Sequence, residues 1–193
     1  MEKCFYILSG PNGAGKTTAA KTFLPEIWHC NRFVNADEIA YQLCPDNPFS
    51  KSLEAGRRML HEIDDLFVHD VQFAIETTLA TRSYFNLARR AQSLGYFVVV
   101  IYFWLPSPMV AQQRVAMRVK EGGHNIPDDV VVRRYYRGLK NFFNNFTTIA
   151  DFWMLVDNSV IPCSTVAQGG KQYKDIKNEL LYSKIYSQCQ NRT

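Results

Sequence analysis

A glycine-rich segment near the start of the chain, GPNGAGKT, constrains the fold more than any other feature. It spans Gly10 to Thr17 and matches the pattern G-x-x-x-x-G-K-[ST] without deviation. A short apolar run, Cys4 to Leu8, precedes it, and a stretch of helical character, Lys16 to Leu24, follows it. A strand, a glycine-rich turn and a helix in this order are typical of a phosphate-binding P-loop, which predicts an α/β domain.

Each part of this segment is suited to binding a nucleotide. The glycines let backbone N–H groups turn towards phosphate oxygens, and the positive end of the following helix points at the same anion. We expect Lys16 to act in catalysis at the β and γ phosphates, and the Thr17 hydroxyl to be a ligand for Mg²⁺. The predicted nucleotide is ATP, with GTP as the alternative. The predicted nucleotide-binding residues of this segment are Gly10, Pro11, Asn12, Gly13, Ala14, Gly15, Lys16, Thr17 and Thr18.

The rest of the chain alternates between strand and helix patterns, which predicts a five-stranded, mainly parallel sheet. The further strands are expected at Arg32–Asn35, Val71–Ile75, Tyr96–Leu105 and Phe152–Val156, and a terminal helix at Lys174–Gln188. Tyr96–Leu105 is continuously apolar, as expected for a central strand that is covered on both faces. In such sheets ligands gather beyond the carboxyl ends of the strands, where the polar motifs of this sequence also fall.

Length and composition exclude several classes of protein. At 193 residues we expect a single domain, 1–193. The longest apolar run has ten residues, far fewer than the roughly 20 that cross a bilayer, so no membrane association is predicted. Without a secretion leader at the N-terminus, the expected location is cytoplasmic. The net charge of +4 is too small to favour a dedicated nucleic-acid binder, and the five scattered cysteines favour neither a disulfide framework nor a structural zinc site.

Three further motifs follow the P-loop: NADEIA at Asn35–Ala40, ETTL at Glu76–Leu79, and RVAMRVKEGGHNIPDDVVVRRYYR at Arg114–Arg137. With the P-loop and in this order, they make residues 3–160 resemble the zeta toxin family of small P-loop kinases, in its compact stand-alone branch. Ala36 departs from the proline that is usual in the family. ABC transporter ATPases also carry the wording GPNGAGKTT, but their LSGGQ-type signature and their later Asp-Glu run are missing from this sequence.

The resemblance implies a three-layer P-loop kinase fold and a kinase activity. The best-studied activity of the family is phosphorylation of UDP-N-acetylglucosamine at the sugar 3′-hydroxyl, so the implied acceptor is a small molecule, a nucleotide-sugar. An antitoxin protein is the partner that the family would suggest. Two alternatives stay open from the residues: a kinase for another metabolite, nucleotide or nucleic-acid end, and a P-loop ATPase or binding module without an acceptor.

Asp37 is the predicted catalytic base. It follows the second strand, where it is placed to accept a proton from a substrate hydroxyl, and the resemblance assigns it the same role. The alternative is an N-cap for a helix that begins at Glu38, since aspartate is favoured at that position.

Glu76 ends an apolar strand, where a carboxylate is costly unless it faces a cleft and meets a hydroxyl or a cation. The resemblance places Glu76 and Thr78 in the binding site of the acceptor. For Thr77 we favour a role as N-cap of the following helix.

The arginine-rich block surrounds a Gly122-Gly123 break, which predicts a helical lid over residues 118–134. Guanidinium groups on a mobile lid are a recurrent way to neutralise the charge of phosphoryl transfer. Arg118 and Arg134 are the predicted catalytic arginines, and Arg133 is the reserve. His124 is predicted either to contact the substrate or to fix the lid through a backbone hydrogen bond.

Asn158 follows the last predicted strand, at the place where P-loop kinases hold the nucleotide base. We predict a contact between Asn158 and adenine, although an Asn-Ser turn needs no such role.

Overall fold

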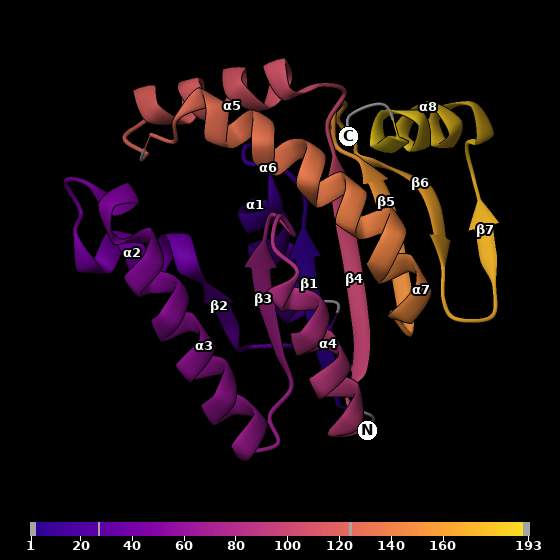
Figure 1. The fold of residues 1–193 in the computed structure, drawn as a ribbon, viewed down its shortest axis with the longest axis horizontal. Helices are drawn as coiled ribbons and strands as arrows, with labels where there is room; N and C mark the ends of the chain where they lie inside the picture. The colour runs from indigo at the N-terminus through magenta and orange to yellow at the C-terminus, as the bar shows by residue number, and fades with distance from the viewer. Residues whose placement is uncertain (1–2, 27, 124, 191–193) are drawn as a thin grey trace.

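The computed structural model describes residues 3–26, 28–123 and 125–190, whose strands form one sheet in the order β2-β3-β1-β4-β5-β6-β7 (Figure 1). The strands are β1 (Cys4–Ser9), β2 (Phe33–Asn35), β3 (Phe73–Thr77), β4 (Phe97–Trp104), β5 (Phe152–Asp157), β6 (Ser164–Gly169) and β7 (Lys174–Ile176). The first five in this spatial order are parallel. This part of the sheet confirms the predicted parallel α/β fold.

The prediction of five strands is wrong at one edge, because two antiparallel strands extend the sheet beyond β5. Both are partly exposed and neither contains an apolar run, so their sequence lacks the signal of a buried strand. Residues Lys174–Ile176 were predicted to begin the terminal helix, but they pair with β6, and the helix α8 spans Glu179–Gln190.

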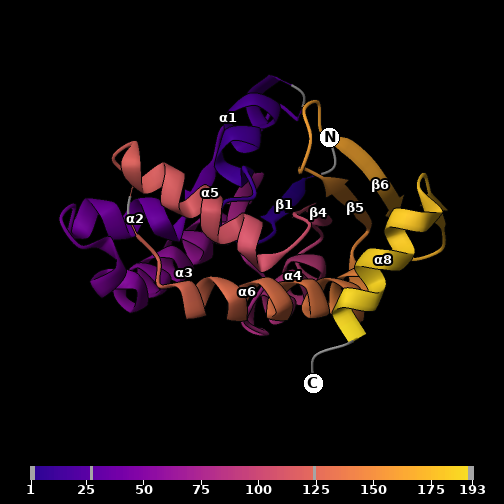
Figure 2. The ribbon, with the colours of Figure 1, turned by 90° about the horizontal axis from the view of Figure 1, so that it is seen from above.

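The helices cover both faces of the sheet and one end of it. They are α1 (Lys16–Glu26), α2 (Ala36–Leu43), α3 (Ser52–Val68), α4 (Ser83–Ser93), α5 (Pro108–Lys120), α6 (Asp128–Asn141) and α8, with a 3₁₀ turn η1 (Pro48–Lys51) before α3. A π-helical turn, η2 (Phe142–Phe146), and a short α7 (Thr147–Ile149) extend α6. Figure 2 shows α1 on one face of the sheet and α4 and α6 on the other. None of the helices in the described part of the chain is both long and apolar enough to span a bilayer.

The core is centred on β4, as its sequence predicts. Residues 98–104 are all buried, with Val98 and Val100 completely inaccessible, because helices cover this strand on both faces. The carboxyl ends of the parallel strands point towards α5 and α6, which lie across that end of the sheet (Figure 1). Loops at this end therefore meet the helices that carry the arginine-rich block.

A glycine fixes how closely α6 approaches the sheet. A Cβ atom at Gly138 would collide with the carbonyl oxygen of Thr78, which directly follows β3. The backbone of α6 therefore packs directly against the end of β3, with no side chain between them.

Candidate active site

The P-loop adopts the conformation that its glycines permit. Gly13 and Gly15 have φ angles of +75° and +76°, a region that other residues rarely adopt. Lys16 begins α1 and is 5% exposed, and its Nζ donates a hydrogen bond of 2.9 Å to the carbonyl oxygen of Pro11. The lysine thus lies across its own loop, at the end of the sheet where ligands gather in this fold.

Asn158 braces the P-loop from the end of β5. Its Nδ2 donates to the carbonyl oxygen of Ala14 at 2.7 Å, and its backbone N–H donates to Trp104 at 3.1 Å. A Cβ atom on Gly15 would come within 2.7 Å of the same Nδ2. The amide therefore has a structural partner in the loop, while its contact with a nucleotide base stays a prediction.

Glu76 is bonded to the P-loop and to β2. Its Oε2 accepts hydrogen bonds from Thr17 Oγ1 at 2.6 Å and from Asn35 Nδ2 at 3.0 Å, and its Oε1 lies 3.5 Å from Lys16 Nζ. The strand order explains this, because β3 lies between β1 and β2 and pairs Glu76 with Leu8 on one side and Asn35 on the other. This largely buried carboxylate is thereby satisfied by two P-loop side chains and by Asn35.

Asn35, and not Asp37, caps the helix α2. The helix begins at Ala36, and Asn35 Oδ1 accepts a hydrogen bond of 2.9 Å from the backbone N–H of Asp37. The alternative in which Asp37 caps a helix starting at Glu38 is therefore wrong, because β2 ends one residue before the helix starts and leaves the cap to Asn35. Asp37 lies in the first turn of α2.

Two cavities meet beside these residues. The first, here called the hydroxyl-rich cavity, has a volume of about 250 Å³, and the second, the P-loop cavity, about 210 Å³. Both are lined by Asn12, Lys16, Asp37 and Glu76. The P-loop cavity continues along Gly13, Gly15, Thr17, Thr18, Arg114 and Arg118. These four shared residues separate a phosphate-binding loop from a second compartment.

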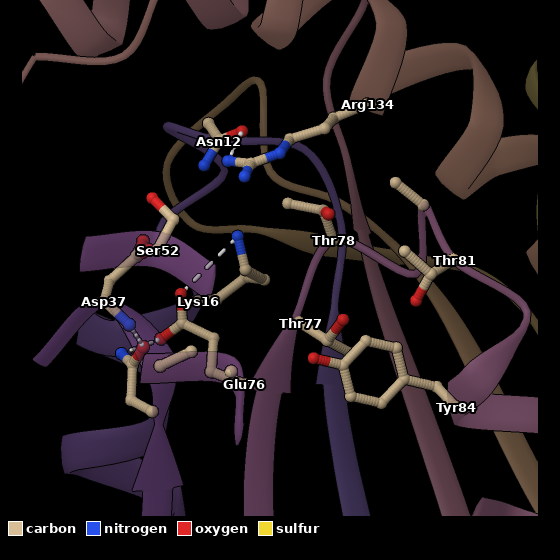
Figure 3. A pocket seen from close by; sticks show the side chains of 14 residues that line it. Asn12, Lys16, Asp37, Ser52, Glu76, Thr77, Thr78, Thr81, Tyr84 and Arg134 are labelled. Atoms are coloured by element: carbon tan, nitrogen blue, oxygen red, sulfur yellow. Dashed lines mark hydrogen bonds and ion pairs between the residues drawn. The ribbon is translucent and has the colours of Figure 1, made fainter. Parts of the chain in front are cut away.

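The hydroxyl-rich cavity takes its name from five side-chain hydroxyls in its lining: those of Ser52, Thr77, Thr78, Thr81 and Tyr84. Figure 3 shows the three threonines and Tyr84 on one side of this space and Asp37, Ser52 and Glu76 on the other. The cavity is thus assembled from the P-loop, α1, β2, α2, α3, β3, α4 and α6, which are spread along the sequence.

Thr77 does not cap the helix that follows it. Its Oγ1 accepts a hydrogen bond of 3.0 Å from the backbone N–H of Leu79, whereas α4 begins only at Ser83. The predicted cap is therefore wrong, because a turn separates β3 from the helix and the hydroxyl stabilises that turn instead.

Tyr84 is a cavity residue that the sequence did not reveal. Burial raises the pKa of its hydroxyl, and both the Asp37 carboxylate and the Arg134 guanidinium act on it electrostatically, in opposite directions. These three groups therefore surround one space. Tyr84 belongs to no recognisable motif, and an aromatic residue near the start of a helix carries no signal of its own.

The structure brings both chosen arginines to the site. Arg118 lines the P-loop cavity, and Arg134 lines the hydroxyl-rich cavity (Figure 3), with its Nη1 3.5 Å from Asn12 Oδ1. Arg114 also lines the P-loop cavity. Arg133, the alternative candidate, is exposed and lines neither cavity. The same is true of Arg137. Their positions on α6 turn them to solvent, although their neighbour Arg134 faces inward.

The segment predicted to be a lid runs from the end of α5 to the start of α6. His124 lies outside the described residues, so its predicted role has no structural counterpart. Ile126 is buried at 2% exposure and, with Pro48 and Phe49, lines a small space beside Asp37 and Arg134. The segment is therefore anchored across the site by an apolar side chain, and its function as a lid stays a prediction.

Comparison with known proteins identifies one related sequence and several solved structures with a similar fold. No family model matches the chain. An uncharacterized protein of Haemophilus influenzae is 30% identical over 126 residues, which are 65% of this chain and 88% of that protein. A chain from the AvrRxo1-ORF1:-ORF2 complex crystallised with ATP superimposes with a TM-score of 0.78 and 16% identity, over 97% of this chain and 64% of its own length.

A chain from the PezAT chromosomal toxin-antitoxin system of Streptococcus pneumoniae gives a TM-score of 0.70 at 17% identity, over 96% of this chain and 79% of that one. These likenesses confirm, at the level of the fold, the resemblance that the four motifs gave. The chain belongs to the family of the Haemophilus influenzae protein, and its fold is that of the zeta toxin type of P-loop kinase.

Proposed function

We propose that the protein is an ATP-dependent kinase that transfers the γ-phosphoryl group of ATP to a hydroxyl group of a small acceptor. The observation that carries this proposal is the shared lining of the two cavities by Asn12, Lys16, Asp37 and Glu76. Phosphoryl transfer requires donor and acceptor in line on either side of the moving group, so two compartments with a common wall suit it.

The P-loop cavity is the proposed donor site. Its backbone N–H groups and the start of α1 would hold the phosphates, and Lys16 would neutralise charge on the β and γ phosphates. The similar fold crystallised with ATP supports ATP as the nucleotide. GTP is the alternative to be tested beside it.

The residues present fit Mg²⁺. Thr17 Oγ1 and the Glu76 carboxylate already lie 2.6 Å apart, and a P-loop hydroxyl with a nearby carboxylate is the donor set that holds this ion in P-loop enzymes. Bound Mg²⁺ would supply positive charge to the β and γ oxygens. Glu76 would thereby act on the donor side, in addition to the contact with the acceptor that the resemblance implies for Glu76 and Thr78.

Asp37 is the proposed base. In the reaction its carboxylate takes the proton of the acceptor hydroxyl, the acceptor oxygen bonds to the γ phosphorus, and the bond from that phosphorus to the bridging oxygen of ADP breaks. Arg118 on the donor side and Arg134 on the acceptor side would neutralise the charge on the equatorial oxygens. Residues 118–134 would exclude water from this step as a lid.

The proposed acceptor is a nucleotide-sugar, with UDP-N-acetylglucosamine as the first compound to test. The five hydroxyls of the second cavity support a polyhydroxylated acceptor, because they can donate to and accept from hydroxyl groups of a sugar. An antitoxin is the proposed protein partner, supported by the likeness to a chain of a toxin-antitoxin system.

Turnover that depends on an acceptor is the decisive test. ATP labelled at the γ position would be incubated with Mg²⁺ and a panel of UDP-sugars, free sugars, nucleosides and short RNA, and both ADP release and labelled product would be measured. We expect ADP release to require one class of hydroxyl compound. Equal ADP release without any acceptor would contradict the proposal and support a P-loop ATPase. The variant Lys16→Ala serves as the control for contaminating kinases.

A further inference from the structure

A third cavity, of about 400 Å³, lies near the β7 edge of the sheet. It shares no lining residue with the other two cavities. It is formed by η2, α7, β5, the β6–β7 turn, β7 and α8. Its lining consists of Phe143, Thr147, Trp153, Gly170, Lys171, Gln172, Tyr173, Lys174, Tyr182 and Tyr186, and we call it the aromatic cavity. Its volume is within the usual range of small-molecule sites.

The aromatic side chains of this cavity support one another. The rings of Tyr182 and Tyr186 are stacked, with centroids 6.4 Å apart and planes inclined by 6°. Phe143 meets both edge-on, with centroid distances of 5.7 and 5.2 Å. Such mutual contacts hold the rings in fixed orientations, so the face of the exposed Tyr186 ring that is turned away from Tyr182 forms a preorganised surface for another flat ring.

A glycine at the end of β6 lets the strand pack closely against Trp153, one of the residues that line the cavity. A Cβ atom at Gly169 would come within 2.6 Å of the ring of Trp153, which is 2% exposed. Any other residue at position 169 would displace this indole ring. The position of this lining residue is therefore fixed by the packing of the edge strands.

The charge of the lining is positive. It contains two lysines and no carboxylate among the described residues. Lys171 is paired with Asp151, but no described carboxylate forms an ion pair with Lys174. The Lys174 Nζ lies 4.6 Å from the centroid of the Tyr182 ring and donates to its hydroxyl at 3.3 Å. An exposed cation without an ion-pair partner among the described carboxylates thus lies over the Tyr182 ring.

We propose that the aromatic cavity binds a small anion that carries an aromatic ring, of the nucleoside monophosphate class. The ring would stack on the face of the exposed Tyr186 ring that is turned away from Tyr182, and the phosphate would pair with Lys174. Gln172 can form hydrogen bonds with polar edges of the ligand, and Thr147 Oγ1, whose own hydrogen goes to the Phe143 carbonyl, can accept one. An uncharged ring would leave Lys174 without an ion-pair partner, and a plain phosphate would leave the exposed aromatic face unused. Both features of the lining are satisfied only by a ligand that combines them.

Calorimetric titration with AMP tests this site. It would be done on the Lys16→Ala chain, so that binding at the P-loop does not obscure the result, with adenosine and ribose 5-phosphate as the probes that carry only one of the two features. We expect AMP to bind one site per chain and more tightly than either probe. Absence of AMP binding, or equal affinity for ribose 5-phosphate, would overturn the proposal.

Two exposed positions locate the site without disturbing the core. In the same background, Lys174→Gln and Tyr186→Ala should each weaken AMP binding roughly tenfold, in the range of one lost stacking or charge contact. Lys184→Gln removes the same charge from the exposed surface of α8 outside the cavity and should leave the affinity unchanged. Equal affinities in all three variants, at unchanged thermal stability, would place AMP elsewhere.

Discussion

Two buried carboxylates lie at opposite ends of the sheet, and their partners differ in kind. Glu76, at the carboxyl end of β3, has a side chain 10% exposed and contacts Thr17, Asn35 and Lys16. Asp151, just before β5 at the amino end, has a side chain 17% exposed. It accepts hydrogen bonds from Val98 N at 2.9 Å and Gln92 Nε2 at 3.0 Å, and it pairs with Lys171.

The partners of Asp151 belong to the start of β4, to α4 and to the β6–β7 turn, so this carboxylate holds elements together. The partners of Glu76 include the two side chains that a nucleotide would need. Burial and pairing are therefore alike at the two ends, and neither identifies a functional carboxylate. We propose that the functional carboxylate is distinguished by the end of the sheet at which it lies and by the chemistry of its partners, and the following variants test this difference.

The largest loss of activity is expected at the carboxyl end from Lys16→Ala. The variant removes the cation from the β and γ phosphates, so kcat should fall by at least roughly 10³. Glu76 keeps its hydrogen bonds from Thr17 and Asn35, so the thermal unfolding midpoint should change little. Acceptor-dependent ADP release and thermal unfolding measure the two effects. Normal turnover in a folded variant would contradict the assignment of the nucleotide site.

Asp37→Asn should lower kcat by at least roughly 10², the lower end of general-base effects, with nearly unchanged affinity for nucleotide. The substitution leaves the helix cap intact, because the cap is Asn35 and uses only the backbone N–H of residue 37. Steady-state kinetics with the true acceptor and nucleotide titration provide the measurement. A near-normal kcat would move the role of base to Glu76.

Two neighbouring arginines on α6 form a matched pair. Arg134→Ala should reduce kcat roughly tenfold or more, because its guanidinium lines the hydroxyl-rich cavity, whereas Arg133→Ala should stay within about twofold. Both variants remove one positive charge from the same helix, so a general effect of charge would appear in both. Equal losses in the two variants would show that the inward position of Arg134 has no bearing on catalysis.

The smallest effect belongs to the amino end, where Asp151→Asn should lower the free energy of unfolding by about 1 kcal/mol at pH 7 and leave kcat unchanged. Burial alone would raise the pKa of Asp151, but hydrogen bonds from Gln92, Lys171 and Val98 outweigh it and lower the pKa below 3.8. A lowered pKa gives stability that is present above the unfolded value and is lost as pH falls through the folded value.

The difference between wild type and Asp151→Asn should therefore shrink below about pH 4 in urea titrations. A difference that is constant between pH 7 and pH 3 would contradict this account. Glu76→Gln is the converse control. In this variant kcat should fall, and the pH dependence of stability that comes from Asp151 should be the same as in the wild type.

The sequence predicts best what depends on neighbours along the chain. The strand, the loop and the helix around Gly10–Thr17 need only local spacing, and β4 is specified by one continuous apolar run. The sequence left open the alternative in which Asp37 caps the helix, because Asn35 and Asp37 can both cap a helix and the end of β2 is defined by its pairing with β3. The strands β6 and β7 were missed because edge strands lack the apolar signal of buried ones.

The site itself depends on the order of the strands. That Glu76 meets Thr17 follows from β3 lying beside β1, and that Tyr84 faces Asp37 and Arg134 follows from α4 and α6 crossing the same cavity. A motif can indicate that both residues matter, but these contacts arise between segments more than 40 residues apart. Asp37 was predicted from its place after the second strand together with the resemblance, and the two arginines from their position in the arginine-rich block. The roles of all three await the variants above.

The contact at Gly138 gives α6 a fulcrum. The helix backbone touches the Thr78 carbonyl at that point, and Arg134 stands four residues earlier, which is about 6 Å along a helix. If the helix tilted about this contact, the displacement of each residue would grow with its distance from Gly138. The start of α6 at Asp128, ten residues from Gly138, would therefore move more than twice as far as Arg134. A tilt of α6 about this contact would thus displace the first turn of the helix more than the part that carries Arg134 beside the hydroxyl-rich cavity.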